Sequence, residues 1–138
     1  MEPQLYKEVM EVLAPHHYEV WCLGGSSNLL PQGVDVDPND IDLVTDAKGI
    51  QHYREALREY LVRDYYNDRT CAYTLEFKIK GVEVEILHYD DPSKAMLEKV
   101  KHMTWQGLEL NILPLPDARK FYAGIGKKEK VKLIEKYL

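Results

Sequence analysis

The sequence predicts a single domain of the α+β class. Helical periodicity runs through residues 2–14 and 49–61, whereas residues 73–79 and 82–87 alternate apolar and polar side chains on either side of Lys80-Gly81. Apolar residues that recur every three to four positions are typical of amphipathic helices, and strict alternation is typical of half-buried strands. The chain has 138 residues, enough to bury one hydrophobic core. We therefore expect one domain, without a linker or an internal repeat.

The first half of the chain is expected to alternate helices and strands. The helix at 2–14 has one apolar face and is stopped by a proline. β-Branched and aromatic residues at 18–23 predict a strand, after which Ser26 or Ser27 can cap a short helix. A second strand follows at 40–45. It should run antiparallel to the first, because the connection is too short for a full crossover helix.

The second half is expected to contain a hairpin and then mainly helices. The hairpin is centred on Lys80-Gly81, where a glycine allows the tight turn. The other expected elements are a polar loop at 64–71, a helix that starts at Asp90-Asp91-Pro92-Ser93 and runs to about Met103, a strand at 108–113, and helices at 117–123 and 127–138.

Composition excludes several classes of protein. With 18 basic and 23 acidic residues the formal net charge is -5, which argues against extended binding of nucleic acid through many phosphate contacts. No run of about 18 apolar residues is present, and the N-terminus lacks the layout of a signal peptide. Cys22 and Cys71 are the only cysteines, so free thiols are expected instead of a disulfide framework. These features predict a cytoplasmic protein that does not enter a membrane.

Gly24-Gly25-Ser26-Ser27 lies where the first strand meets the short helix. Glycines allow a phosphate to approach the backbone closely, the free N–H groups at a helix start favour an anion, and a serine hydroxyl adds a donor. A tight turn without a ligand is the alternative. The segment is neither a P-loop nor a dinucleotide fingerprint.

Asp40 and Asp42 open the second strand. Because successive strand residues point to opposite faces, these two acids share a face while Ile41 and Leu43 enter the core. Two neighbouring carboxylates repel each other unless a positive charge lies between them, and a divalent cation is the simplest candidate. A solvated strand edge is the alternative interpretation.

Glu83 and Glu85 occupy one face of the hairpin strand at 82–87. If this strand lies beside the one that bears Asp40 and Asp42, either glutamate could complete a cluster of three carboxylates. Such a cluster could hold two divalent ions about 3.5–4 Å apart against a triphosphate. The run Lys127-Lys128-Glu129-Lys130 is interpreted as a solvated helix start, with a phosphate or acceptor contact as the alternative.

Taken together, these residues resemble the nucleotidyltransferase superfamily typified by DNA polymerase beta, and within it the small-molecule and antibiotic nucleotidyltransferases. The motifs that match are Leu23-Gly24-Gly25-Ser26, Asp40-Ile41-Asp42-Leu43 and Val84-Glu85-Ile86. The resemblance implies a nucleotidyltransferase-like mixed β-sheet flanked by helices. It places a catalytic core at about 18–90 and a helical C-terminal part at about 91–138, within one domain at 1–138.

The same resemblance implies a metal-dependent enzyme. It would transfer a nucleoside monophosphate from a nucleoside triphosphate such as ATP to a hydroxyl acceptor and release pyrophosphate. The cofactor implied is Mg²⁺, as two ions, with Mn²⁺ as the alternative. The site residues implied are Asp40, Asp42 and Glu85 for catalysis and metal binding, and Gly24, Gly25, Ser26 and Ser27 for the nucleotide.

The chain departs from the superfamily pattern in three respects. Residues 35–39 carry no basic side chain before the paired acids, and the third acid is Glu where Asp is commoner. No large second domain is present to hold an acceptor, so this site should come from the C-terminal helices, a second copy in a homodimer, or a partner protein. The alternative function is a non-catalytic binding module of the same fold that acts with a partner, as in a toxin–antitoxin or regulatory pair.

Overall fold

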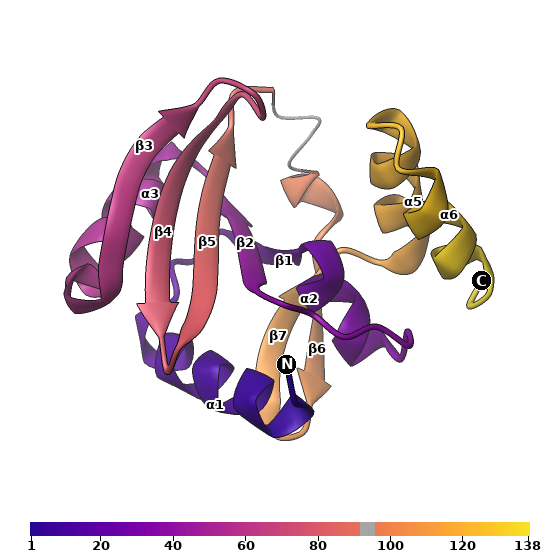
Figure 1. Cartoon of the computed structure of the whole chain (residues 1–138), viewed down its shortest axis with the longest axis horizontal. Coiled ribbons are helices and arrows are strands. Elements are labelled where there is room, and N and C mark those ends of the chain that lie inside the picture. Colours follow the sequence, from indigo (N-terminus) through magenta and orange to yellow (C-terminus); the bar gives the residue numbers. More distant parts are fainter. Residues whose placement is uncertain (92–95) are drawn as a thin grey trace.

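The computed structural model describes residues 1–91 and 96–138, and its centre is a five-stranded sheet (Figure 1). The strand order is β1-β2-β5-β4-β3; β2 and β5 run parallel, and the other neighbours run antiparallel. The expected mixed sheet, and the antiparallel pairing of its first two strands, are therefore confirmed. The strands are β1 Trp21–Gly24, β2 Ile41–Thr45, β3 Leu61–Asn67, β4 Ala72–Ile79 and β5 Val82–Tyr89.

Helices flank this sheet, and a separate two-stranded hairpin lies beside it (Figure 1). No helix in the described ranges combines the length and the apolar character needed to cross a membrane. The α-helices are α1 Pro3–Leu13, α2 Gly25–Leu29, α3 Ala47–Ala56, α5 Leu115–Gly124 and α6 Lys128–Glu135, the 3-10 turns are η1 Ala14–His16, η2 Leu30–Gln32, η3 Arg58–Tyr60 and η4 Leu97–Lys99, and the hairpin strands are β6 Lys101–Trp105 and β7 Leu108–Ile112.

The larger hydrophobic cluster fills one face of the sheet. Leu23, Leu43 and Ile86, on three neighbouring strands, pack there with apolar residues of α1 and α3. In α1 the buried residues recur at helical spacing, as the sequence predicted. Asp46 caps α3, because its carboxylate accepts a hydrogen bond of 2.8 Å from the backbone N–H of Gly49. This cluster fixes the positions of β1, β2 and β5.

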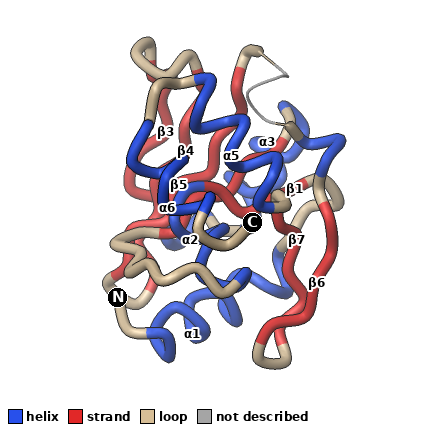
Figure 2. Tube along the Cα trace, turned by 90° about the vertical axis from the view of Figure 1, so that its right-hand side faces the viewer, coloured by secondary structure: helices blue, strands red, loops and turns tan. Residues whose placement is uncertain are grey.

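A smaller hydrophobic cluster lies on the opposite side, between β1, α2 and the C-terminal helices. Cys22, Leu29, Ala118, Tyr122 and Ile134 are buried in it. Figure 2 shows α5 and α6 in front of the sheet, with the β6–β7 hairpin to one side. The C-terminal helices therefore cover the part of this face that is nearest to α2.

One buried side chain joins α2 to the C-terminal part. The Asn28 amide donates to the carbonyl oxygen of Leu113 and accepts from its backbone N–H, both at 2.9 Å. Gln32 donates to the same carbonyl, also at 2.9 Å. Because Leu113 directly precedes the segment that leads into α5, these bonds set where α5 and α6 begin.

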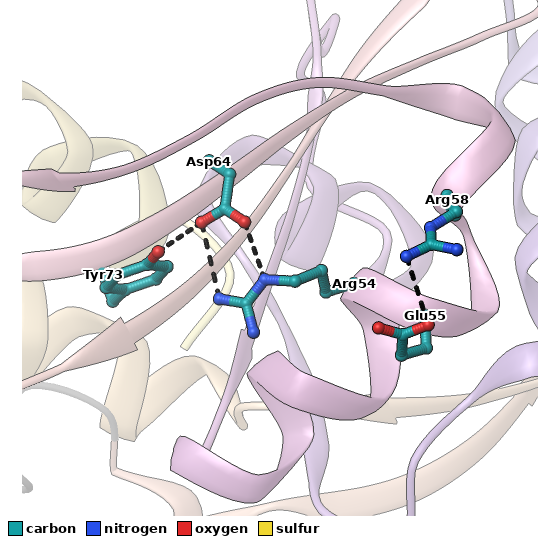
Figure 3. Close-up of polar contacts among 5 residues, drawn as sticks. All are labelled: Arg54, Glu55, Arg58, Asp64 and Tyr73. Atoms are coloured by element: carbon teal, nitrogen blue, oxygen red, sulfur yellow. Dashed lines mark hydrogen bonds and ion pairs between the residues drawn. The ribbon is translucent and has the colours of Figure 1, made fainter.

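The expectation of a polar loop at 64–71 is wrong over residues 64–67, because β3 extends through Asn67, and is confirmed for the turn at 68–71. Figure 3 shows why this polar segment is held: Arg54 of α3 donates to Asp64 at 2.6 Å, and Tyr73 of β4 donates to the same carboxylate. Among the strands of the described residues, β3 pairs with β4 alone and forms an edge of the sheet. Charged residues are common on edge strands because they discourage pairing with other chains.

Two further expectations need correction. The helix predicted to run to about Met103 is wrong over its described part, where η4 is followed by β6; its first turn falls partly on residues 92–95, outside the described residues. The C-terminal part is thus a hairpin followed by two helices. Neither Ser26 nor Ser27 caps α2, since the residue that precedes this helix is Gly24.

Candidate active site

The centre of the candidate site is a row of residues across adjacent strands. Gly24 of β1 is paired in register with Asp42 of β2, and Asp42 with Glu85 of β5. Glu85 is in turn opposite Glu76 of β4. Residues in register on neighbouring strands share a face of the sheet, so three carboxylates follow the glycine on one face.

A pocket of about 380 Å³ opens at the β1–β2 end of this row. Asp40 and Asp42 both line it, as their shared face predicted. One wall is the strand-to-helix turn, and the opposite wall is formed by α5 and the start of α6. The lining residues include Gly24, Gly25, Ser26, Asp40, Asp42, Leu87, Tyr89, Phe121, Tyr122, Lys127 and Lys130.

The turn at Gly25 is shaped around Asp42. Gly25 has a φ of +55°, and a Cβ atom at this position would lie 2.6 Å from Oδ2 of Asp42. Ser27 is buried beneath the turn: its hydroxyl donates to the Gly24 carbonyl at 2.6 Å and accepts from the Asp42 N–H at 3.1 Å. Ser27 therefore holds the turn against β2 and faces away from the pocket, while Ser26 lines it.

Two acids of the row, Asp42 and Glu85, have raised pKa values. Burial, followed by the charges of Asp40 and Glu85, raises the pKa of Asp42 to about 7, and Lys127 opposes this shift. Burial and the neighbouring charges of Glu76, Asp40 and Glu83 raise the pKa of Glu85. Burial and the charge of Asp42 also raise the pKa values of two tyrosines, Tyr89 and Tyr122. The pKa of Tyr122 is raised to about 12. A cation at this point would relieve the repulsion.

Glu83 and Glu85 lie on the same strand but in different surroundings. Glu85 is half-buried and in register with Asp42, whereas Glu83 is exposed and opposite Lys78. The geometry thus puts Glu85 beside the aspartates. Sequence reasoning missed Glu76, because no local pattern shows that β4 places this residue opposite Glu85.

Two lysines of the C-terminal part also reach the site. Lys130 Nζ donates to Ser26 Oγ at 2.8 Å, and Lys127 lines the pocket beside Asp42. The sequence predicts a solvated helix start for this lysine run, with a phosphate or acceptor contact as the alternative. It shows no local signal for this approach, which depends on how α5 and α6 pack against α2.

A metal ion fits the donor chemistry of the pocket only in part. Among the described residues, no three His, Cys, Asp or Glu side chains are arranged as a ready group of metal ligands. Asp40 and Asp42 nevertheless face one pocket, and Mg²⁺ is commonly held by one or two carboxylates together with substrate phosphates. The residues present therefore suit a cation that arrives with its phosphate ligand.

The architecture is that of a nucleotidyltransferase-like α+β fold. A crystal structure of a "putative nucleotidyltransferase" from Thermotoga maritima superposes on the chain with a TM-score of 0.76 and 22% sequence identity. The match covers 99% of this chain and 94% of the other. No protein-family model matches the sequence, and no curated protein matches it significantly. The likeness therefore rests on the fold.

Proposed function

We propose that the protein is a metal-dependent nucleotidyltransferase that transfers a nucleoside monophosphate from a nucleoside triphosphate to a hydroxyl acceptor. The observation that carries this proposal is the register of Gly24, Asp42 and Glu85 on three adjacent strands. In this register the glycine turn, the half-buried Asp42 and the half-buried Glu85 are neighbours in one row, which supports a site for a cation and a phosphate. The fold that the chain shares with the Thermotoga maritima protein supports the same class of reaction.

In this proposal each group has a separate task. Gly25 leaves room for the Asp42 carboxylate beside the turn where the phosphate tail would lie. Ser26 lines the same pocket and offers a hydroxyl donor. Phe121 and Tyr122 form an aromatic wall against which the nucleoside can pack. Asp40 and Asp42, with Glu85, would hold Mg²⁺ or Mn²⁺, which supplies positive charge to the triphosphate when bound.

Glu85 is the proposed base. The acceptor oxygen forms a bond to the α-phosphorus as the bond from that phosphorus to the β-phosphate oxygen breaks. The hydroxyl proton passes to Glu85, and pyrophosphate leaves. Its place in register with Asp42 puts this carboxylate beside the aspartates, where it could accept the proton of an acceptor hydroxyl.

The test is pyrophosphate release with Mg²⁺, a panel of nucleoside triphosphates and hydroxyl acceptors. Asp42→Asn and Glu85→Gln should lower turnover by a factor of about 10² or more, in line with the usual contribution of a catalytic acid or base. Asp42→Asn should fold at least as stably as the wild type, because it removes a half-buried charge that lies beside other acids.

Glu83→Gln is the matched control, since Glu83 lies on the same strand but is exposed. It should retain turnover. If Glu83→Gln inactivates the protein and Glu85→Gln does not, the role of base moves to Glu83. Full activity of Asp42→Asn would refute the assignment of this row as the catalytic centre.

The alternative is a binding module of the same fold that acts with a partner protein. The lack of a ready group of three metal ligands among the described residues favours it. Thermal unfolding with Mg²⁺ and nucleotide distinguishes the two functions, because a ligand of the native state adds about 2.7 kcal/mol of stability at 100 times its Kd. A thermal shift without pyrophosphate release on any acceptor would support the module.

A further inference from the structure

We infer that Lys127 and Lys130 form a polyphosphate subsite of this pocket and make the protein select nucleoside triphosphates over monophosphates. The inference rests on the proposed function, since it assigns the phosphate tail of the same substrate. It identifies the residues that replace the basic side chain missing before Asp40.

The first support is the position of Lys130. Its ammonium group donates to Ser26 Oγ at 2.8 Å, and its side chain is half-buried. Ser26 belongs to the turn at which a phosphate can approach the backbone. The ammonium group therefore already lies next to the turn where a phosphate oxygen would bind. It can exchange its hydrogen bond with the serine oxygen for one with that stronger acceptor.

The second support is the charge balance of the pocket. Asp40 and Asp42 line it, and the loop at 35–39 that leads to them adds two more acids and no base. A triphosphate is itself strongly anionic, so it would be repelled without local cations. Lys127 and Lys130 are the lysines that line the same pocket. They come from a part of the chain that is remote in sequence.

The third support is the anchoring of α6. Ile134 is fully buried, Arg119 of α5 donates to Glu135 at 3.3 Å, and the Tyr137 hydroxyl accepts from the Asp35 N–H at 2.9 Å. These contacts tie both the helix and its end to the rest of the molecule. Lys127 and Lys130 are thus presented from a fixed base instead of a free tail.

The same helix provides controls. Lys132 lies on α6 but lines a different surface hollow, with Ala123 and Glu135. Lys128 lines this hollow too, and also one that it shares with Lys127 and Lys130, so Lys132 is the sharper control. Both are exposed lysines of the same helix and carry the same charge as Lys130. A general effect of net charge would be the same for all four positions, whereas a polyphosphate subsite separates Lys127 and Lys130 from the other two.

The experiment is isothermal titration calorimetry of the full chain with ATP, ADP, AMP and inorganic tripolyphosphate in the presence of Mg²⁺. Lys130→Met and Lys127→Met should each weaken ATP and tripolyphosphate binding about ten-fold, as expected for the loss of one charge-assisted contact. AMP binding should change less than about two-fold by the same reasoning. Lys128→Met and Lys132→Met should leave all four affinities unchanged.

Lys130→Arg provides the rescue, because it keeps a cation at the same point and should recover most of the ATP affinity. Equal losses for ATP and AMP, or equal losses in the Lys132→Met control, would overturn the inference while leaving the proposed function in place. If the wild-type protein binds neither ATP nor tripolyphosphate with Mg²⁺, this result contradicts both the proposed function and the inference. Circular dichroism of each variant identifies losses that are due to misfolding.

Discussion

Gly25 has a left-handed backbone conformation and lies directly against the Asp42 carboxylate. Its positive φ is easily adopted by glycine, and its missing side chain leaves the space that Asp42 Oδ2 occupies. An L-residue would meet two separate costs here, one in the backbone and one against Asp42. A glycine with a positive φ but no such contact is needed to separate these two costs.

Gly25→Ala should therefore lose both stability and ligand binding. The left-handed conformation costs an L-residue about 1–2 kcal/mol, and the added Cβ forces the Asp42 carboxylate to move. Urea unfolding measures the first effect, and titration with Mg²⁺ and ATP measures the second.

Gly33→Ala is the control for this prediction, since Gly33 also has a positive φ but a Cβ there would contact nothing within 4 Å. It should show a similar loss of stability and unchanged ligand binding. Equal nucleotide affinity in the two variants would show that the Gly25–Asp42 contact does not shape the pocket.

At the scale of elements, local pattern predicted the strands whose two faces differ. β4 and β5 alternate buried and exposed residues, so their periodicity is visible in the sequence. β3 and β6 are largely exposed on both faces, and their polar sequences resemble loops or helix surfaces. Each pairs with the strand that follows it directly, β3 with β4 and β6 with β7, so it is the polar sequence of these strands, and not the distance to their partners, that hides them.

For the candidate site too, local pattern predicts some of the relations between residues and not others. Alternation on single strands was enough to group Asp40 with Asp42 and Glu83 with Glu85. The parallel pairing of β2 with β5, which puts Glu85 beside Asp42, is a tertiary relation. So is the approach of Lys130 to Ser26, because it depends on how α6 packs against α2.

Asn28 is expected to control that packing. Asn28→Ala removes both bonds to Leu113 and leaves a buried backbone N–H without a partner, which should cost about 2 kcal/mol. Hydrogen exchange in residues 115–135 should accelerate, because α5 and α6 lose their attachment to α2. Urea unfolding and exchange mass spectrometry measure the two effects.

Gln32→Ala is the milder comparison. It removes the donor to the Asn28 and Leu113 carbonyl oxygens but leaves both bonds between the Asn28 side chain and Leu113 in place. It should cost less than Asn28→Ala and leave the exchange of α5 and α6 nearly unchanged. The opposite order of effects would show that the C-terminal helices are held mainly by the hydrophobic cluster.

For the whole molecule, the pH dependence of stability should carry a contribution from His17. Its ring stacks on Trp21 with centroids 3.6 Å apart, and its Nδ1 lies 2.9 Å from the Tyr53 hydroxyl. Burial, then the nearby His16 and His52, lower the pKa of His17 to about 4. The ring thus joins the segment after α1 to both β1 and α3 in its neutral form.

The sign of the effect follows from the two pKa values. Below about 6.5 the unfolded chain binds a proton at His17 that the folded protein does not bind until about pH 4. Stability should therefore be full above pH 6.5 and fall by about 1.4 kcal/mol per pH unit as the pH drops through this window. His17→Gln removes the titrating group, so its stability should fall less steeply, and its deficit relative to wild type should shrink by up to about 3 kcal/mol by pH 4.

His102→Gln makes the comparison specific, because hydrogen bonds with Asn111 and Glu109 raise the pKa of His102. Its stabilising contribution is present at low pH and is lost as the pH rises, so the deficit of His102→Gln should grow on acidification while that of His17→Gln shrinks. Urea unfolding of the three proteins between pH 7.5 and about pH 4 tests both signs at once. Parallel pH profiles for His17→Gln and wild type would mean that His17 is solvated and that its stacked ring does not hold this junction together.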